Sequence, residues 1–399
     1  MVFNPIPVKI TAFRPNRDII VKHAMNHKRE VLKYMEKAFE LAEQGLFTTG
    51  ENPRVGCVLV KDGQIVGEGF HLRPGEPHAE VYALQQAGEH AKGSTAYVTL
   101  EPCCHHGKTP PCSQALIDAG IKRVVVANTD PNALVGGQGI KQLKEAGIEV
   151  ITGVLAELGD DLNAGFFKRM QHQLPLVRCK LAQSIDGRTA MASGESYWIT
   201  GEAARRDVQH WRARSGAIIT GVETVIQDNC RLTVRPDDLP DNDKNKPHFF
   251  SEQQPLRVII DSRLRTPLHA KILQQQPVLL VCAQASEEQK QSFRDIGCEV
   301  ETMPGLDHRV DLAAVLVYLG QLGINEVLVE AGATLAGAFV KDKLLDELVI
   351  YTAPVLMGAS GRPLLDFHID KMVDRLHIQT ISMQAFDQDW RLRATLNDN

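Results

Sequence analysis

Two short segments of the sequence bring histidine, cysteine and glutamate together at spacings that suit a metal site. His78 and Glu80 lie in PHAE, and Cys103 and Cys112 lie in EPCCHHGKTPPC (101–112), with both segments expected at helix N-termini. Zn²⁺ favours imidazole and thiolate ligands, and a catalytic zinc keeps one of its four positions open for water. The helix dipole favours thiolates at the N-terminus of a helix. One histidine and two cysteines give the required three ligands, and Glu80 is left free to carry protons.

The His-x-Glu and Pro-Cys elements match the signature of zinc deaminases, with one departure. That signature places the second cysteine three residues after the first, where this chain has His106, and Cys112 comes nine residues after Cys103. The alternatives are buried cysteines or a structural zinc site closed by Cys104 or His106. We favour the catalytic interpretation, because a structural site has no use for a carboxylate beside its histidine.

Alternating helices and strands are expected around these segments. A helix from Lys28 to about Gly45 and a hairpin turning at Asp62-Gly63 come first. Further helices are expected at 78–91 and 112–119, and strands at 55–60, 64–70, 96–100 and 123–127. The pattern predicts a three-layer α/β/α domain over 28–172, whose end overlaps a linker at 171–175. Residues 1–27 lack sustained periodicity, and we expect a disordered extension.

A second α/β domain is expected over 173–399. Strands are predicted at 176–182, 217–221, 256–261, 278–283, 326–330 and 347–353, with helices at 201–214, 310–323 and 333–342. Continuous apolar strands indicate a sheet buried on both faces. The domain lacks a GxGxxG motif after a strand, so a Rossmann domain is not supported. The polar stretch 236–254 is expected to be a surface loop.

Composition limits the classes of function. The 399 residues are enough for two or three domains, and 44 Lys and Arg against 49 Asp and Glu give a charge of −5 without a basic stripe. We therefore expect no nucleic-acid partner. Apolar runs stay below the ~18 residues that span a bilayer, and no signal peptide is evident, so we expect a cytoplasmic protein without a membrane partner. The eight cysteines then suit metal binding or chemistry better than disulfides. The five outside the cluster are interpreted as buried small apolar residues: Cys57, Cys179, Cys230, Cys282 and Cys298.

Longer motifs resemble a known family in both halves of the chain. GENPRVGCVLV (50–60), HAE and PCCHHGKTPPC resemble the deaminase half of the bifunctional riboflavin-biosynthesis deaminase-reductases, in which an HHGKTPP-type insertion separates the zinc cysteines. KLAQSIDGRTA (180–190), SGESYWIT (193–200) and GVETVIQDNCRLTVR (221–235) resemble the reductase half. The resemblance covers about residues 29–399. It implies a cytidine-deaminase-like N-terminal domain and a dihydrofolate-reductase-like C-terminal domain.

The resemblance also implies site residues. The zinc ligands would be His78, Cys103 and Cys112, the proton shuttle Glu80, and Cys104 a bystander where the family usually has serine. The pyrimidine pocket would be lined by Asn52, His71, His105 and Lys108. In the reductase cleft the catalytic residues would be Lys180 and Glu330, the substrate-binding residues Ser196, Arg212, Asp228, Leu232 and Arg235, and the cofactor-binding residues Trp198, Thr200 and Gly332. Simpler roles stay open: Asn52 or Asp228 in a turn, Trp198 in the core, and Arg212 or Lys108 solvated.

The implied function is a two-step conversion of a small pyrimidine ribotide. A zinc hydroxide would deaminate 2,5-diamino-6-(5-phosphoribosylamino)pyrimidin-4(3H)-one, and NADPH would then reduce its ribosyl group to ribityl. The alternatives are another zinc-dependent nucleoside or RNA deaminase fused to a reductase-like domain, and a zinc module without activity. We expect a homo-oligomer, either a dimer or a tetramer.

Overall fold

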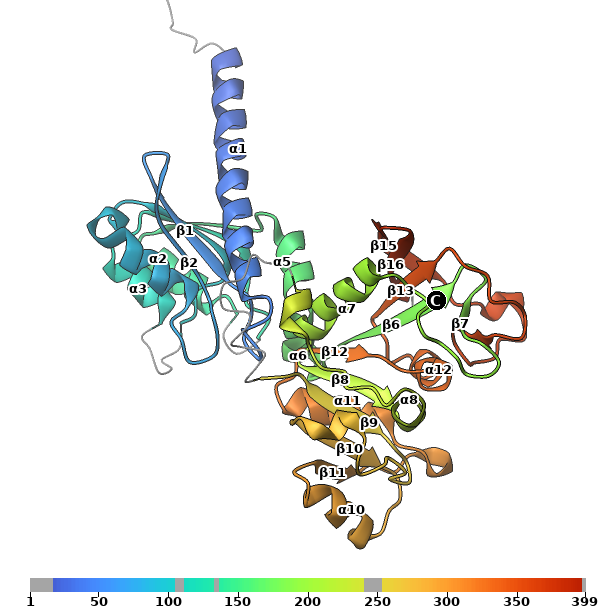
Figure 1. Cartoon of the computed structure of the whole chain (residues 1–399). Helices are drawn as coiled ribbons and strands as arrows, with labels where there is room; N and C mark the ends of the chain where they lie inside the picture. The colour runs from blue at the N-terminus through green and yellow to red at the C-terminus, as the bar shows by residue number, and fades with distance from the viewer. Residues whose placement is uncertain (1–16, 105–110, 133–135, 240–252, 397–399) are drawn as a thin grey trace, which may run out of the picture.

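The computed structural model describes residues 17–104, 111–132, 136–239 and 253–396, with side chains from residue 28 onward. Figure 1 shows two lobes, each built on its own sheet, with α6 (Ala164–His172) at their junction. No helix in the described ranges has both the length and the apolar character needed to cross a membrane.

The first lobe has three layers around a five-stranded sheet. Its strands are β1 (Gly56–Lys61), β2 (Gln64–Phe70), β3 (Thr95–Leu100), β4 (Arg123–Asn128) and β5 (Glu149–Thr152), in the order β2-β1-β3-β4-β5. β1 is antiparallel to β2 and β3, whereas β3, β4 and β5 are parallel. One face packs on α1 (Arg17–Ala42) and α5 (Ala156–Leu162), the other on α2 (Ala79–Ala87), α3 (Cys112–Asp118) and α4 (Gln138–Glu145). The predicted α/β/α layering is confirmed.

Helix α1 differs from the prediction at its start. It begins at Arg17, eleven residues before the expected Lys28, so residues 17–27 are helical where an extension without regular structure was expected. From Val31 onward the helix is fixed by packing on the sheet, with Met35 and Ala38 fully buried. Once that part is formed, each added residue gains a hydrogen bond without a new nucleation cost, which is how a helix extends past its packed face. The outer turns project beyond the lobe (Figure 1).

The second lobe contains a nine-stranded sheet in the order β11-β10-β9-β8-β12-β6-β13-β16-β15. The strands are β6 (Leu176–Ser184), β8 (Ala217–Gly221), β9 (Leu256–Ile260), β10 (Val278–Cys282), β11 (Glu299–Thr302), β12 (Glu326–Val329), β13 (Glu347–Ala353), β15 (Ile378–Phe386) and β16 (Asp389–Leu396). Neighbours from β11 to β13 are parallel, and β16 and β15 are antiparallel additions. β7 (Arg188–Ala190) and β14 (Arg362–Pro363) form a separate small sheet.

Helices cover both faces of this sheet, as the apolar strands predicted. α11 (Leu312–Gln321) and α12 (Ala333–Lys341) pack on one face, and α7 (Glu202–Arg214) and α10 (Glu287–Arg294) on the other; α8 (Val222–Asp228) follows β8. Alternate residues of β12 face opposite sides of the sheet. Val327 and Val329 pack in the core beneath α11 and α12, and Leu328 packs in the core beneath α7 and α10. Full burial of one such side chain contributes about 1.5–3 kcal/mol to the stability of the folded state. Because the strands bury many of them, this sheet is the rigid base of the lobe.

A histidine at the contact between the lobes predicts a pH effect on stability. The ring of His210 on α7 lies edge-on to Phe47 of the first lobe, with ring centroids 5.2 Å apart. Burial lowers the pKa of His210 from 6.5 to about 4, and the Arg214 charge acts in the same direction. Between these two pH values the unfolded chain binds a proton that the folded chain does not bind, so stability falls as the pH is lowered from 6.5 toward 4.

We expect urea unfolding to show this loss of stability between pH 7 and pH 5, and we expect the loss to be about 2 kcal/mol smaller in a His210→Gln variant. The wild type and the variant are measured at both pH values, so that other titrating groups cancel in the comparison. Equal losses for the two proteins would contradict the assignment.

Candidate active sites

In the first lobe, the structure brings together the three side chains that the sequence predicts as zinc ligands. The ligand atoms of His78, Cys103 and Cys112 all lie within 4.8 Å of one another. His78 Nδ1 is 3.2 Å from the Cys112 Sγ and 3.5 Å from the Cys103 Sγ. Nitrogen and sulfur atoms this close can share one tetrahedral Zn²⁺. The donor set therefore fits the ion.

Two helix starts and a strand end position this cluster. His78 is the N-cap residue of α2, and Cys112 is the first residue of α3, directly after Pro111. Cys103 follows β3, and the backbone N–H of Ser113, at 3.1 Å, and its hydroxyl, at 3.0 Å, donate to the Cys103 carbonyl. The Cys112 N–H points at the Cys103 sulfur at 3.4 Å. Unpaired N–H groups at a helix N-terminus stabilise thiolates, and hydrogen bonds from Cys112 and His78 lower the pKa of Cys103 to about 4.

Glu80 lies beside the cluster and is only 3% exposed. Burial raises the pKa of its carboxyl to about 7, and the Cys103 thiolate acts in the same direction. A cation held by the cluster would favour the carboxylate form. The charges and hydrogen-bonding groups that shift this pKa include all three cluster residues, so the Glu80 carboxyl lies close to the metal-binding atoms. A carboxyl group in this place can carry a proton at neutral pH.

Asn52 and His71 form a polar pair next to the cluster. The Asn52 Nδ2 lies 3.0 Å from His71 Nε2, and the His71 ring is edge-on to the His78 ring at 5.5 Å. Burial lowers the pKa of His71, so the ring is neutral, and Nδ1 donates to the Pro77 carbonyl at 3.3 Å. His71 Nε2 must then accept from Asn52, which leaves the Asn52 carbonyl oxygen free to accept a hydrogen bond. Asn52 is thus more than a turn residue.

The remaining predicted residues of this site divide into two groups. His105 and Lys108 lie outside the described residues, as does His106. Cys104 is described and half-buried, and it is not a member of the metal-binding group found among the described side chains. Burial raises the pKa of its thiol, which disfavours the thiolate that a zinc ligand must be.

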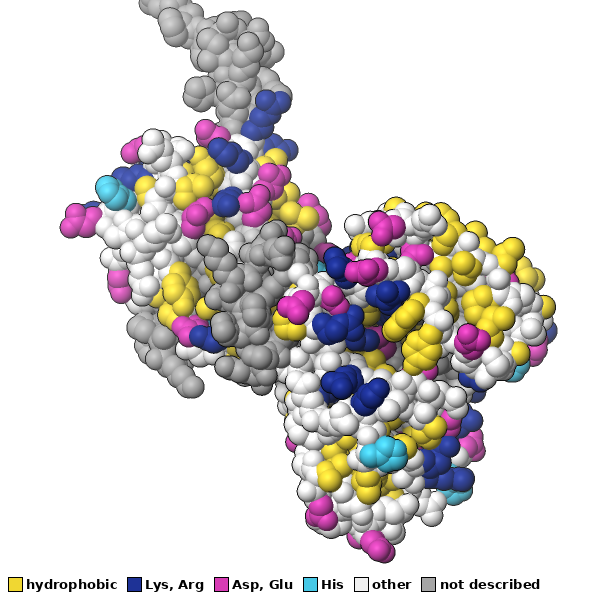
Figure 2. Space-filling view, in the orientation of Figure 1, with side chains coloured by type: hydrophobic (Ala, Val, Ile, Leu, Met, Phe, Trp, Pro, Cys, Tyr) yellow, Lys and Arg dark blue, Asp and Glu magenta, His cyan; other side chains and the backbone are white. Residues whose placement is uncertain are grey.

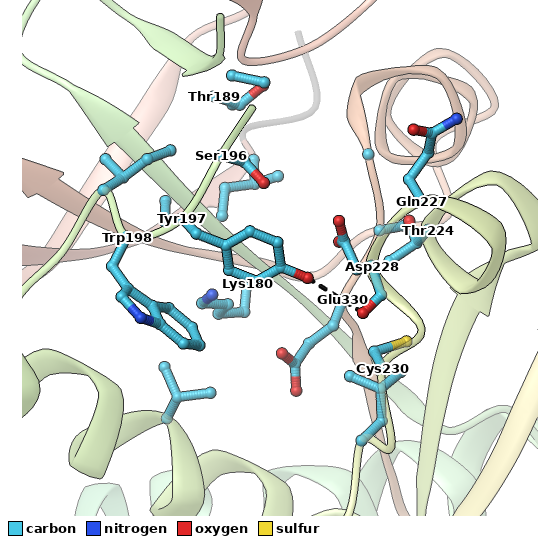
Figure 3. Close-up of a pocket in the computed structure, with 18 of the residues that line it drawn as sticks. Lys180, Thr189, Ser196, Tyr197, Trp198, Thr224, Gln227, Asp228, Cys230 and Glu330 are labelled. Atoms are coloured by element: carbon cyan, nitrogen blue, oxygen red, sulfur yellow. Dashed lines mark hydrogen bonds between the residues drawn. The ribbon is translucent and has the colours of Figure 1, made fainter. Parts of the chain in front are cut away.

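In the second lobe, a cleft of about 760 Å³ gathers every residue that the sequence analysis assigns to the reductase site. These residues are Lys180, Ser196, Trp198, Thr200, Arg212, Asp228, Leu232, Arg235, Glu330 and Gly332. In Figure 3, Trp198 lies on one side, Asp228 and Cys230 lie on the opposite side, and Lys180 and Glu330 lie between them. The cleft lies at the carboxyl ends of the parallel strands, where open α/β sheets bind their ligands.

The base of the cleft holds a buried ion pair. Arg212 Nε donates to Glu330 at 2.5 Å and its terminal nitrogen donates to the other carboxylate oxygen at 2.9 Å, so the pair is bidentate. Burial opposes ionisation of Glu330, yet the Arg212 charge holds the pKa of that carboxyl below its usual value. Arg212 is therefore not a solvated helix residue. Burial lowers the pKa of Lys180, while Glu330 favours its charged form.

The rim of the cleft is aromatic and basic. The Trp198 side chain is 70% exposed, so it does not belong to the core, and Arg205 lies over its ring at 4.7 Å. Seven Lys and Arg side chains line the cleft against three acidic ones. Figure 2 shows Lys and Arg gathered between the positions of α7 and α8. Arg235, predicted to bind the sugar phosphate, is half-exposed and paired with Asp238 at 2.5 Å.

Some lining residues were not singled out from the sequence. The Tyr197 hydroxyl donates to the Asp228 backbone carbonyl at 3.0 Å, so its ring reaches from the Trp198 side toward Asp228, as Figure 3 shows. Cys230, interpreted from the sequence as a buried apolar residue, also lines the cleft, as do Lys271 and Arg362. Tyr197 lies inside the SGESYWIT motif. Its neighbours in that motif were assigned to the cleft, and this was the signal that could have identified Tyr197 as well. Nothing in the local sequence places Lys271 or Arg362 beside the site.

The layered first lobe with its His/Cys/Cys cluster and buried Glu80, joined to a second α/β lobe with a basic cleft, defines a zinc-binding deaminase fused to a reductase. The family model "Cytidine and deoxycytidylate deaminase zinc-binding region" matches residues 28–128, and "RibD C-terminal domain" matches residues 175–392. The chain belongs to the RibD family of riboflavin-biosynthesis proteins. The family combines a deaminase and a reductase in one chain, and both domains are present here.

Individual relatives match over nearly their whole length. The chain is 49% identical to "Riboflavin biosynthesis protein RibD" of Escherichia coli K12, over 86% of this chain and 92% of that one. It is similar to the solved structure of Acinetobacter baumannii RibD, with a TM-score of 0.85, 48% identity, and coverage of 93% of this chain and 100% of that one. A Thermotoga maritima structure described as a diaminohydroxyphosphoribosylaminopyrimidine deaminase/5-amino-6-(5-phosphoribosylamino)uracil reductase matches with a TM-score of 0.80 and 30% identity over 93% of this chain and all of that one.

Proposed function

We propose that the chain catalyses two steps on one pyrimidine ribotide. A deaminase domain over 28–172 hydrolyses the amino group of 2,5-diamino-6-(5-phosphoribosylamino)pyrimidin-4(3H)-one, and a reductase domain over 173–399 converts the ribosyl group to ribityl with NADPH. The observation that carries the proposal is the His78, Cys103 and Cys112 cluster with Glu80 buried against it. The T. maritima relative, named for both reactions, supports the choice of substrate.

In the first site, His78, Cys103 and Cys112 would hold Zn²⁺, which supplies water activated near neutral pH. Glu80 accepts a proton from the attacking water and returns it to the departing amino group. The ring carbon gains an oxygen, its bond to nitrogen breaks, and ammonia leaves. The free Asn52 carbonyl oxygen is placed to accept a hydrogen bond from an N–H on the ring edge. Neutral His71 holds the Asn52 amide in that orientation. His105 and Lys108 complete the pocket in this proposal.

In the second site, NADPH supplies a hydride to C1′ of the ribose. The bond from C1′ to the ring oxygen breaks, so that oxygen needs a proton. Lys180 lies beside the ion pair at the base of the cleft, and its ammonium donates this proton. The Glu330 carboxylate lies beside it and is held by Arg212, so it stabilises the charged lysine.

Phosphate and cofactor groups suit the rest of the cleft. Gly332 is the N-cap of α12, and a Cβ added there would meet no neighbouring atom, so a phosphate can approach the helix N-terminus closely. Exposed Trp198 offers a ring face to the nicotinamide side of the cofactor, together with Thr200. Asp228 and Arg235, with the backbone at Leu232, would contact the ribotide from the side opposite Trp198, and Ser196 would contact it from the Trp198 segment.

The direct test is incubation with the diaminopyrimidinone ribotide and NADPH. Ammonia release and loss of nicotinamide absorbance are followed separately. We expect ammonia to form without NADPH and NADPH oxidation to require the deaminated product. Oxidation of NADPH in the absence of any ammonia release would contradict the proposed order. A nucleoside or RNA deaminase is not favoured, because the reductase family model accounts for residues 175–392.

We also propose that two copies of the chain associate through β15. This strand lies at the edge of the nine-stranded sheet, and Ile378, Ile381 and Met383 on it are exposed, as are Met372 and Val373 before it. An apolar edge strand without a covering element favours pairing with another chain. We expect light scattering to give at least a dimer, and Met383→Asp to shift it toward the monomer. A monomeric wild type would contradict this surface.

The eight cysteines are all free, including the three at and beside the metal cluster. Thiolate ligands and unpaired cysteines persist in reducing compartments. This supports our proposal that the chain works in the cytoplasm on small-molecule substrates.

A further inference from the structure

The loop that carries Asn52 in the deaminase lobe is fastened to the reductase lobe. This loop, residues 50–54, precedes β1. The Asn325 side chain donates to the Gly50 carbonyl at 3.0 Å. Arg169 on α6 donates to the Asn325 carbonyl oxygen at 2.6 Å and to the Glu51 carbonyl at 2.8 Å. Asn325 immediately precedes β12, the strand that leads to Glu330 in the reductase cleft.

Arg54 makes the third attachment from within the loop. Its guanidinium donates to Glu326 at 2.5 Å, to the Leu162 carbonyl at 2.8 Å and to the Arg214 carbonyl at 3.3 Å. The side chain is 8% exposed and the Glu326 side chain 1%, so this ion pair is shielded from water. Buried charge-assisted hydrogen bonds of a planar guanidinium fix geometry more strongly than exposed ones.

The Arg54 backbone is fixed as well. Its N–H donates to the Asn163 side chain at 2.8 Å, and its carbonyl accepts from the same amide at 2.9 Å. Asn163 lies between α5 and α6, at the end of the deaminase lobe that meets the second sheet. Both the backbone and the side chain of Arg54 are thus determined by groups at the junction of the lobes. Asn52 is two residues away and has little freedom to move independently.

We infer that Asn325 and Glu326 of the reductase lobe, acting through Arg169 and Arg54, are positioning residues for Asn52 in the deaminase pocket. The inference rests on the proposed deamination. Asn52 contacts His71, and His71 lies against His78, so the contacts run from the start of β12 to the metal cluster. The deaminase pocket of this chain therefore has its correct shape only with the reductase lobe docked.

Arg54 is the most suitable residue to substitute, because the Glu326 carboxylate keeps other positively charged partners when Arg54 is lost. Glu326 also accepts hydrogen bonds from Arg178 and from Arg214, the latter at 2.9 Å. Loss of Arg54 leaves that carboxylate paired, whereas loss of Glu326 would leave three guanidiniums without their shared partner. Arg54→Met and Asn325→Ala therefore remove contacts of the loop while the charge of Glu326 stays compensated.

Helix α6, which carries Arg169, also offers a matched control. Lys168, next to Arg169 on α6, pairs with Asp346 of the second lobe at 2.7 Å. Lys168→Met removes an ion pair between the lobes without touching residues 50–54. The control separates general weakening of the junction from displacement of the loop.

The experiment measures steady-state deamination of the diaminopyrimidinone ribotide by full-length wild type, Arg54→Met, Asn325→Ala and Lys168→Met, with zinc content determined for each. We expect the two loop variants to raise KM about tenfold, a loss of about 1.4 kcal/mol in binding. Their kcat should stay within about threefold, because no hydrogen bond or ion pair among the described residues joins the loop to Glu80 or to the metal ligands. Lys168→Met should match the wild type. Reduction of the separately supplied deaminated product should be unchanged in all four proteins.

Either loop variant alone decides the question. A KM equal to that of Lys168→Met in a folded, zinc-loaded loop variant would overturn the inference. So would a fall in zinc content that accounts for the whole loss of activity. If one variant does not fold, the other supplies the answer, and if neither folds, the loop contacts serve stability and the positioning role is rejected. A wild type that does not deaminate the ribotide would instead refute the proposed function.

Discussion

A Glu80→Gln variant is expected to lose deamination by about 10²- to 10⁴-fold while it keeps its zinc. Glutamine preserves the size of the side chain but cannot accept a proton from water. The carboxyl is 3% exposed and adjacent to all three predicted ligands without being one of them, so its removal should not release the ion. Ammonia release at saturating ribotide gives the rate, and zinc content is measured on the same sample.

Two controls belong to this measurement. Glu89→Gln changes an exposed glutamate just after α2 and should leave deamination unchanged. NADPH-dependent reduction of the deaminated product reports on the other lobe and should also be unchanged in Glu80→Gln. Near-normal deamination by the zinc-loaded variant would remove Glu80 from the mechanism.

The second large effect is expected in the other cleft, from Lys180→Met. Methionine fills a similar volume but cannot donate a proton, so we expect reduction to slow by about 10²- to 10³-fold, as for loss of one transition-state donor. Ammonia release should be unaffected. The assay follows nicotinamide absorbance with the deaminated product as substrate.

Lys341→Met, which alters an exposed lysine at the end of α12, is the matched control for charge. If Lys180→Met reduces the product as fast as this control does, the proton donor lies elsewhere in the cleft. Glu330 is not the alternative donor, because the Arg212 charge holds the pKa of its carboxyl below the usual value and favours the carboxylate.

Local patterns in the sequence predicted the elements that position both sites. The apolar strands 217–221 and 347–353 recur as β8 and β13 with the same bounds, because their continuous burial leaves a plain signal. The exposed β15 lacks such a signal, since its residues face solvent on both sides for most of its length, and it was not predicted. α10 was also missed, although Ser286 and Gln289 form a capping box that the sequence displays.

Contacts between distant segments explain what the sequence could not predict. The zinc cluster was found because PHAE and PCCHHGKTPPC are two compact motifs with their own chemistry. Arg54 and Glu326 are 272 residues apart, and each alone resembles an ordinary charged residue. Only the fold shows that they meet at a buried junction. Similarly, Arg212 was predicted to bind the substrate, and the structure shows that its guanidinium is paired with the Glu330 carboxylate.

The most direct test of the account is zinc-edge X-ray absorption on the full-length protein, with Cys112→Ser as a comparison. We expect one zinc per chain, bound by one nitrogen and two sulfurs at about 2.0–2.3 Å, with the oxygen of a water molecule in the remaining position. Cys112→Ser should lose most of the metal. A zinc with four protein ligands, or metal binding that survives Cys112→Ser unchanged, would contradict the catalytic site described here.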